Sequence, residues 1–375
     1  MRVRDDVGTL DDITATAVRT TGLSDFGDDT HEEGLGVLLQ DYASASGLTG
    51  VGNYRMRGMV KGLLVAKLMA QQGFSANPAV KDVAIDRPVF IMGLPRSGTT
   101  LLQRLLTADP AHQGLEQWLA DLPQPRPPRD TWESDPIFGA MQAGYAAFHE
   151  ANPELAGLHY SDAASHEECW RLLQHTGRSV AFETQAFTPG YSAWLAGQDW
   201  TPAYERHRAL LQLIGLNDTE KRWILKNPSH LVALDAIKAV HPDAVVVVTH
   251  RDPVACTASM CSLAAASTRG TSDVFVGDTI GRTQLDLLAR EQAAFRASPH
   301  SGDVVDVAYD DLVADPLTTV RGVYGAAGLE WSDAGAAAVS AELARSRSGV
   351  RAPKHAYDLA DYGLTEAQVR DVLTE

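Results

Sequence analysis

Cysteine is scarce in this chain of 375 residues, which has only three, and no two of them form a CxxC motif. Cys169, Cys256 and Cys261 are too few, and too irregularly spaced, for a disulfide framework or a thiolate zinc site. Positive charge is also short, because 32 Lys and Arg against 48 Asp and Glu give 32 − 48 = −16. A general nucleic-acid-binding protein needs a basic face, so the composition disfavours that function class.

Long apolar runs are missing as well. The purest run, residues 244–248, is far shorter than the roughly 20 residues that a membrane-spanning helix needs. The first twelve residues lack the apolar stretch of a signal peptide. We therefore expect a cytoplasmic protein without stable membrane insertion. The remaining composition, 45% apolar and 21% charged, is that of a globular protein with ample material for a buried core.

The first 85 residues are predicted to be mostly helical. Thr9 and the residues after it suit a helix start, and an Ala-, Leu- and Met-rich segment at 54–72 follows. We interpret residues 1–85 as a helical segment that packs on the core. Residues 86–375 then form the main α/β domain, with a helical insertion at about 120–215.

Apolar, β-prone runs alternate with helices in this main domain. They lie at 88–92, 222–225, 244–249 and 303–308. Such alternation indicates a parallel sheet covered by helices on both faces, a three-layer fold of the P-loop type. Ligands of such sheets bind at the carboxyl ends of the strands. Each candidate strand is followed there by a polar or charged residue: Arg96, Lys226, Arg251 and Tyr309.

The segment 93–100, GLPRSGTT, has the outline of a phosphate-binding loop. Its glycines let the backbone curl so that N–H groups point at phosphate oxygens, and the next helix adds its positive N-terminus. Arg96 supplies charge, and Thr99 and Thr100 supply hydroxyls. The alternative is a tight turn without a ligand.

One departure from nucleoside triphosphatases concerns the loop lysine, because Thr99 stands where their Lys reaches the terminal phosphates. No clear apolar strand ends in a magnesium-binding carboxylate, and Asp252 before Pro253 has the pattern of a helix N-cap. The loop therefore predicts an anionic nucleotide bound without a metal.

A second anion-binding site is predicted at the end of the candidate strand 244–249, which has the longest apolar run. Ser259 follows Arg251 by eight residues, and two helical turns bring it back to the face of the helix start. The two side chains are then placed to hold one phosphate. The alternative is a surface arginine paired with Asp252 and an incidental serine.

Together these residues resemble the PAPS-dependent sulfotransferases, especially the bacterial branch, and are similar to the tyrosylprotein sulfotransferases. Segment 90–102 looks like the family's 5′-phosphosulfate loop, and Arg251 with Ser259 looks like its 3′-phosphate site. Segments 223–230, 309–312 and 354–364 are also similar, so the likeness runs from about residue 88 to 365. The resemblance implies metal-independent transfer of a sulfuryl group from PAPS to a hydroxyl or amine of a small-molecule acceptor, with PAP as product.

The resemblance also implies residue roles. The 5′-phosphate would contact the loop residues Ser97, Gly98, Thr99 and Thr100. Arg96 and Lys226 would stabilise charge on the leaving oxygen and the moving sulfuryl group, and Tyr309 would contact the adenine. Glu116 would be the general base, since it follows the loop helix where related enzymes carry theirs. His159, Glu167 and Glu168 are rivals for that role, and Arg351 and Lys354 are further candidates for the 3′-phosphate.

Two other functions stay open at this point. One is a P-loop kinase, which the missing loop lysine disfavours, and the other is a non-catalytic nucleotide-binding module, which Glu116 and Lys226 disfavour. The acceptor and the oligomeric state cannot be read from the sequence. Aromatic residues of the insertion are candidates for the acceptor pocket: Trp118, Tyr160, Tyr191 and Trp194.

Overall fold

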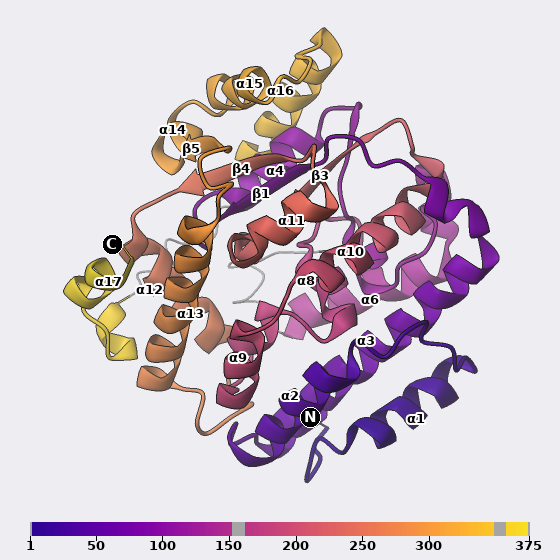
Figure 1. The fold of residues 1–375 in the computed structure, drawn as a ribbon, viewed down its shortest axis with the longest axis vertical. Helices are drawn as coiled ribbons and strands as arrows, with labels where there is room; N and C mark the ends of the chain where they lie inside the picture. The colour runs from indigo at the N-terminus through magenta and orange to yellow at the C-terminus, as the bar shows by residue number, and fades with distance from the viewer. Residues whose placement is uncertain (1, 152–161, 349–357, 374–375) are drawn as a thin grey trace.

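The computed structural model describes residues 2–151, 162–348 and 358–373 (Figure 1). A five-stranded sheet in the order β2-β3-β1-β4-β5 forms its centre, and every neighbouring pair of strands is parallel. The strands are β1 (Val89–Gly93), β2 (His112–Gln113), β3 (Arg222–Lys226), β4 (Val245–His250) and β5 (Val305–Ala308). The parallel sheet flanked by helices confirms the predicted fold class. The two residues of β2 were not predicted, because so short a strand has no periodicity to detect.

Both faces of the sheet are covered by helices, and β1 shows this best because all five of its residues are buried. Phe90 and Met92 join one hydrophobic cluster with α10 (Thr201–Ile214) and α11 (Leu234–Val240). Val89 and Ile91 join another with α4 (Thr99–Thr107) and α15 (Pro316–Ala327). Successive side chains of a strand point to opposite faces, so one strand contributes to both layers.

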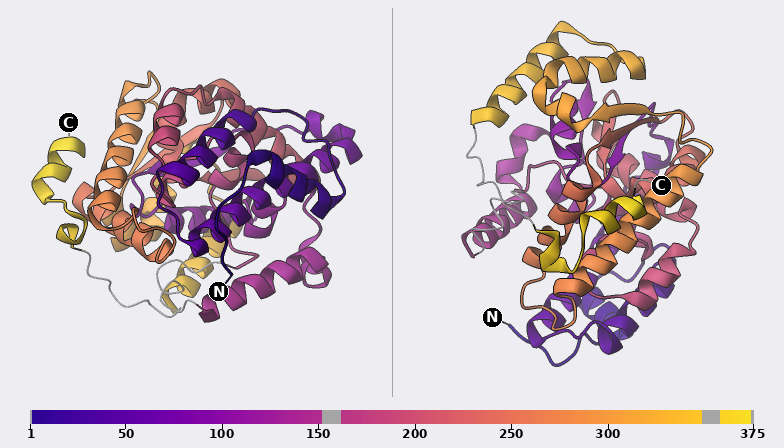
Figure 2. Two further views of the ribbon diagram at one scale, coloured as in Figure 1. Left: turned by 90° about the horizontal axis from the view of Figure 1, so that it is seen from below. Right: turned by 90° about the vertical axis from the view of Figure 1, so that its left-hand side faces the viewer.

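The N-terminal helices form a layer whose hydrophobic cluster also includes residues from later in the chain, such as Val180, Tyr191 and Leu287. This layer contains α1 (Leu10–Thr21), α2 (Glu32–Ser44) and α3 (Gly50–Ala76). The Thr9 hydroxyl accepts a hydrogen bond from the Asp12 N–H and caps α1, as its sequence predicts. These helices lie at the opposite end of the molecule from α15 and α16 (Asp333–Ser348) (Figure 1, Figure 2).

Further helices surround the sheet, and several of them contribute residues to the site. They are α5 (Gln117–Asp121), α6 (Pro136–Ala151), α8 (Trp170–Leu173), α9 (Pro189–Ala196), α12 (Pro253–Ser267), α13 (Gly277–Ala297), α14 (Tyr309–Ala314) and α17 (Glu366–Leu373). Short 3₁₀ helices connect them: η1 (Pro78–Asp82), η2 (Arg129–Ser134), η3 (Gln174–Thr176), η4 (Val180–Thr184), η5 (Gly215–Asn217), η6 (Pro228–Ala233) and η7 (Leu359–Tyr362). No helix in the described part of the chain combines the length and apolar character needed to cross a membrane.

Candidate active site

The loop between β1 and α4 has the curled backbone that its sequence predicts. Gly93 and Gly98 have φ values of 141° and 95°, which strongly favour glycine. A Cβ at Gly93 would lie 2.4 Å from the Thr249 carbonyl oxygen. Arg96 is also left-handed, with φ of 70°, although it is not a glycine. Strained residues of this kind are concentrated at functional sites.

Ser97 supports the loop from inside. Its buried hydroxyl donates to the Leu94 carbonyl at 2.6 Å and lies 2.5 Å from the Thr249 hydroxyl, while its N–H also bonds Leu94 O. Both polar groups of Ser97 are thus engaged within the protein. The amides of the first turn of α4, at Thr99 and Thr100, have no carbonyl partner within the helix and are available to an anion.

The two predicted anion-binding elements meet at Arg96. Its Nε donates to the Ser259 hydroxyl of α12 at 3.3 Å, and its carbonyl accepts from Arg251 Nη1 at 2.7 Å. The Arg251 guanidinium lies 4.1 Å from the centroid of the Tyr309 ring. Asp252 caps α12, with Pro253 as its first residue, as predicted. The fold therefore brings together four sequence-predicted site residues from three strand ends.

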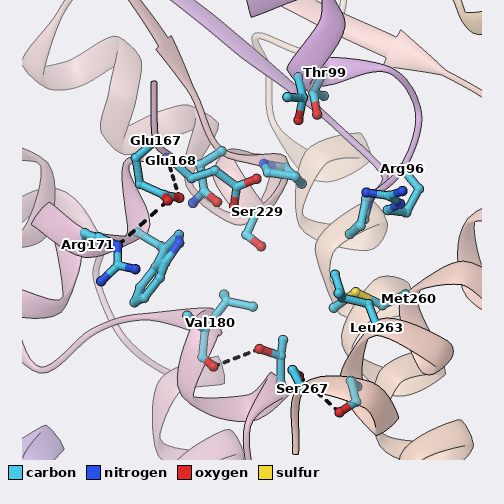
Figure 3. Close-up of a pocket in the computed structure, with 18 of the residues that line it drawn as sticks. Arg96, Thr99, Glu167, Glu168, Arg171, Val180, Ser229, Met260, Leu263 and Ser267 are labelled. Atoms are coloured by element: carbon cyan, nitrogen blue, oxygen red, sulfur yellow. Dashed lines mark hydrogen bonds and ion pairs between the residues drawn. The ribbon is translucent and has the colours of Figure 1, made fainter. Parts of the chain in front are cut away.

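A cavity of about 790 Å³ opens beside this cluster (Figure 3). Arg96 and Thr99 lie on one side of it, and Glu167 and Glu168 lie across from them. Gly98, Thr100, Arg251 and Tyr309 also belong to its lining, whereas Ser97, buried in the loop, and Ser259, which reaches the site through Arg96, are not lining residues. Cations and carboxylates thus face one another across a single cavity.

Lys226 ends β3 and contacts a cavity carboxylate. Its side chain is only 2% exposed, and its Nζ lies 2.6 Å from Glu168 Oε1. Glu168 is 23% exposed and faces the cavity. Because β3 and β1 are adjacent, with Ile91 beside Lys226, this ion pair stands next to the strand that carries the phosphate loop.

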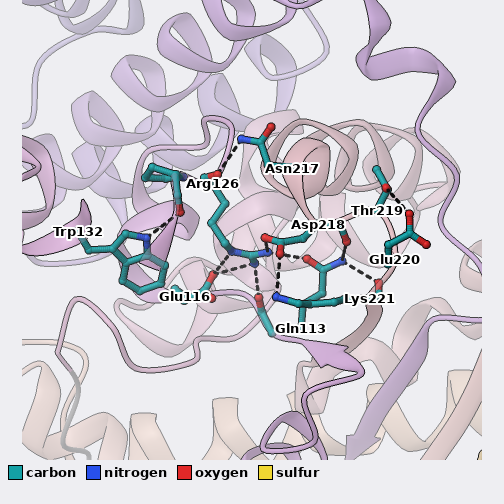
Figure 4. Close-up of polar contacts among 11 residues, drawn as sticks. Gln113, Glu116, Arg126, Trp132, Asn217, Asp218, Thr219, Glu220 and Lys221 are labelled. Carbon is teal, nitrogen blue, oxygen red and sulfur yellow. Dashed lines mark hydrogen bonds and ion pairs between the residues drawn. The ribbon is translucent and has the colours of Figure 1, made fainter. Parts of the chain in front are cut away.

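Glu116 is held in a different place from the one expected of a catalytic base (Figure 4). Its Oε2 accepts hydrogen bonds from Arg126 Nη2 at 2.9 Å and Nε at 3.1 Å. Arg126 also contacts Asp218 Oδ2 at 3.0 Å and Gln113 Oε1 at 2.5 Å. The next residue, Gln117, lines the cavity, but Glu116 does not. The structure therefore engages this carboxylate in a buried ion-pair network and does not bring it to the cavity.

Other candidate residues are also absent from the cavity lining. Tyr191 is buried and donates its hydroxyl to the Gly177 carbonyl at 2.7 Å, and Trp118 is buried in the core. Neither they nor Trp194 line the cavity. His159, Tyr160, Arg351 and Lys354 lie outside the described residues. The Ser179 hydroxyl accepts from the Ala181 N–H and caps the start of η4.

Several lining residues were missed by the sequence analysis. Arg55 and Met59 come from α3, some forty residues before the loop, and no local pattern marks them. Met260, Leu263 and Ser267 line the cavity from α12 and continue the face of the helix at helical spacing. Extending the helix beyond Ser259 would have found this second group, because residues three, four and seven positions apart share a face.

A buried carboxyl group lies behind the β3 end of the site. Glu291 of α13 is fully buried, and burial raises its pKa to about 7 against an opposing hydrogen bond with Ser229. Ser229 is one of the cavity-lining residues (Figure 3). At neutral pH this group therefore carries a proton for a substantial part of the time.

Comparisons with known proteins agree with this fold. The Sulfotransferase family model matches residues 88–333. The crystal structure of sulfotransferase STF1 from Mycobacterium tuberculosis H37Rv superposes with a TM-score of 0.91 at 49% identity, covering 99% of both chains. STF9 from Mycobacterium avium gives a TM-score of 0.88 at 26% identity, covering 99% of this chain and 96% of that one.

A curated relative has a more specific name. The omega-hydroxy-beta-dihydromenaquinone-9 sulfotransferase Stf3 of Mycobacterium tuberculosis is 27% identical over 277 residues. That match spans 66% of this chain and 64% of the relative's length. The similarity thus extends over most of the chain but less than two thirds of Stf3.

Proposed function

The chain belongs to the sulfotransferase family, and from that premise we propose that it moves a sulfuryl group from PAPS to a hydroxyl or amine of a small-molecule acceptor, without a metal. The observation that carries the proposal is the cluster at Arg96, which joins the phosphate loop to Arg251 and Ser259. Two separate cationic positions beside one cavity suit a nucleotide with phosphates at both ends of its ribose.

The residues around the cavity fit such a nucleotide. The amides of Gly98, Thr99 and Thr100 at the start of α4 would hold the 5′-phosphate, together with the threonine hydroxyls. Ser97 would shape the loop from inside. Arg251 and Ser259 would hold the 3′-phosphate, and the Tyr309 ring, already against Arg251, would contact the adenine. When bound, PAPS supplies the sulfuryl group and leaves as adenosine 3′,5′-bisphosphate.

Lys226 and Arg96 are the cations assigned to charge stabilisation. Lys226 is almost fully buried, so its charge acts through a poorly screened medium on negative charge that develops nearby. One such contact is typically worth about 3–4 kcal/mol in a transition state. Its ion pair with Glu168 fixes the ammonium at the end of β3.

We assign the base to Glu168 in place of Glu116. Glu168 faces the cavity and touches Lys226, whereas the Glu116 carboxylate is held by Arg126 outside the cavity lining. As the acceptor oxygen attacks sulfur, Glu168 takes its proton. The name of the Stf3 relative describes a hydroxylated compound, which agrees with a hydroxyl acceptor for this chain.

Nucleotide protection tests the donor site. We expect adenosine 3′,5′-bisphosphate to raise the melting temperature in the absence of magnesium, and ATP with magnesium not to do so. Arg251→Gln should weaken the bisphosphate by about 10- to 100-fold, since it removes a charge-assisted contact. Arg321→Gln, on the exposed side of α15, is the matched control and should leave binding unchanged. Equal protection by ATP would favour a kinase instead.

Transfer from labelled PAPS to hydroxyl acceptors tests the reaction. We expect Glu168→Gln to remove the acidic limb of the pH–rate profile, where protonation of the base stops the reaction, and Glu116→Gln to leave the shape of that profile intact. A protein that binds the bisphosphate yet transfers nothing to any acceptor would be the non-catalytic alternative.

A further inference from the structure

The cavity extends beyond the cluster of charges into an apolar lobe. We use this term for the surface formed by residues of α3, η4 and α12: Met59, Val180, Ala181, Met260, Leu263 and Ala264. In Figure 3, Val180, Met260 and Leu263 lie at the opposite end of the cavity from Thr99 and the two glutamates. A volume of about 790 Å³ is near the upper end of the roughly 300–1,000 Å³ of small-molecule sites, so the cavity has room for a second reactant.

Most polar side chains near the lobe donate their hydrogen bonds to backbone carbonyls of the protein. The Thr184 hydroxyl donates to the Ala181 carbonyl at 2.9 Å, and the Ser267 hydroxyl donates to the Ala264 carbonyl at 3.1 Å. The Arg55 guanidinium donates to the Ser267 carbonyl and joins α3 to the end of α12. These hydroxyl donors are engaged, so they are poorly placed to bind the many hydroxyls of a sugar.

Carboxylates in the lining lie at the other end, and Arg55 is a charged lining residue on the side of the lobe. Glu167, Glu168 and Arg171 lie on the wall above Val180 in Figure 3. Arg171 is paired with Asp121 Oδ1 at 2.5 Å and stacks on the Trp170 ring at 4.5 Å. Carboxylates are absent from the described lining residues contributed by α3, η4 and α12. The Arg55 guanidinium is engaged with the Ser267 carbonyl, so the lobe presents mainly apolar side chains and matches a molecule whose polar group lies at one end.

We propose that the apolar lobe binds the hydrocarbon chain of an uncharged alcohol, whose hydroxyl is directed at Glu168 and Lys226. This inference rests on the proposed function and names the acceptor class. The alcohol oxygen forms the new bond to sulfur, the bond from sulfur to the bisphosphate of PAPS breaks, and the hydroxyl proton passes to Glu168. The chain gains affinity from transfer out of water and not from hydrogen bonds.

Alcohol binding can be measured without PAPS. We would bind the neutral fluorophore 1-aminoanthracene and displace it with 1-decanol. Leu263→Gln and Met59→Gln place an amide in the lobe at half-buried positions and should weaken decanol about tenfold. Leu10→Gln makes the same change at a half-buried site of α1, outside the lining, and should not alter displacement. Failure of decanol to displace the probe, or equal effects of all three variants, would overturn the assignment.

Chain length gives the second test. Over 1-butanol, 1-hexanol and 1-octanol, kcat/KM for sulfation should rise about three- to fourfold per added methylene, and glucose should be a poor acceptor. A rate independent of chain length, or glucose as good as octanol, would contradict the inference. Bisphosphate protection reports separately on the proposed function, because the three Gln variants leave the donor residues intact and should keep it.

Discussion

The ion pair between Lys226 and Glu168 permits a test that separates catalysis from stability. The perturbations are Lys226→Met and Glu168→Gln, singly and together. Glu168→Gln leaves an ammonium that is 2% exposed without its carboxylate, and loss of one partner of a buried pair costs about 3 kcal/mol. Lys226→Met leaves a carboxylate that still faces the cavity, so it should cost less, about 1 kcal/mol.

The double variant removes both charges and should recover stability. We expect a coupling free energy of about 2 kcal/mol in urea unfolding, because the two groups share one direct contact. Activity should not recover. Lys226→Met should lower kcat by about 10²- to 10³-fold, and the double variant should keep that loss, since the transition-state charge still lacks its cation.

The assay pairs urea midpoints with transfer rates on one hydroxyl acceptor for all four proteins. If activity returned in the double variant together with stability, Lys226 would serve only to compensate Glu168, and its catalytic role would be refuted. If neither single variant lost stability, Lys226 and Glu168 would not form the buried ion pair described above.

Three further predictions concern the ionisation of buried side chains and the backbone conformation of the phosphate loop. Burial raises the pKa of Glu291 from 4.5 to about 7, so the contribution of this group to the free energy of unfolding is fully present below pH 4.5 and is lost as the pH rises to 7. Glu291→Gln should therefore gain about 2 kcal/mol more at pH 8 than at pH 5 in urea unfolding. Burial lowers the pKa of His230 to about 3 and of His241 to about 4, so the contribution of each neutral imidazole to the free energy of unfolding is present above pH 6.5, and each should lose about 2 kcal/mol between pH 7 and pH 5. His241→Phe keeps a ring beside Phe90 and should reduce this loss. An unchanged slope of stability against pH would contradict the prediction. Gly98→Ala should lower the free energy of unfolding by about 1–3 kcal/mol and weaken binding of the bisphosphate, because φ is 95° and the new Cβ would lie 3.1 Å from the Tyr309 ring. Gly36→Ala in α2 is the control, because its Cβ meets no neighbouring atom, and calorimetry should find it neutral or stabilising.

The sheet and the phosphate loop were predictable because their signals are local. A buried parallel strand must be continuously apolar, and a curled anion-binding loop must place glycine where φ is positive. Both constraints act within about ten residues, as β1 and Gly98 show. The sequence also predicted that Ser259 would return to the face of the α12 start, since helical geometry fixes that spacing.

The cavity walls were not predictable in the same way. Arg55 meets Ser267 across more than two hundred residues, and the contact exists only because the fold brings the start of α3 to the end of α12. No periodicity in either helix encodes its partner, because an amphipathic face specifies burial and not the identity of the neighbour. Sequence reasoning therefore predicted the helix that became α3 but not the contribution of α3 or η4 to the apolar lobe.

The position of the Glu116 side chain shows most clearly what the sequence could not predict. Motif position placed a carboxylate near the loop helix, and Glu116 is indeed next to Gln117, which lines the cavity. The direction of its side chain was decided by Arg126, ten residues later, which turns back to bind it. Arg126 also binds Gln113 and Asp218, so its guanidinium bridges the segment after α4 to the start of β3. If the Glu116 carboxylate left this network, the buried Arg126 guanidinium would lose one of its two carboxylate partners. The energetics therefore favour a structural role for Glu116 and leave the proton to a carboxylate that faces the cavity.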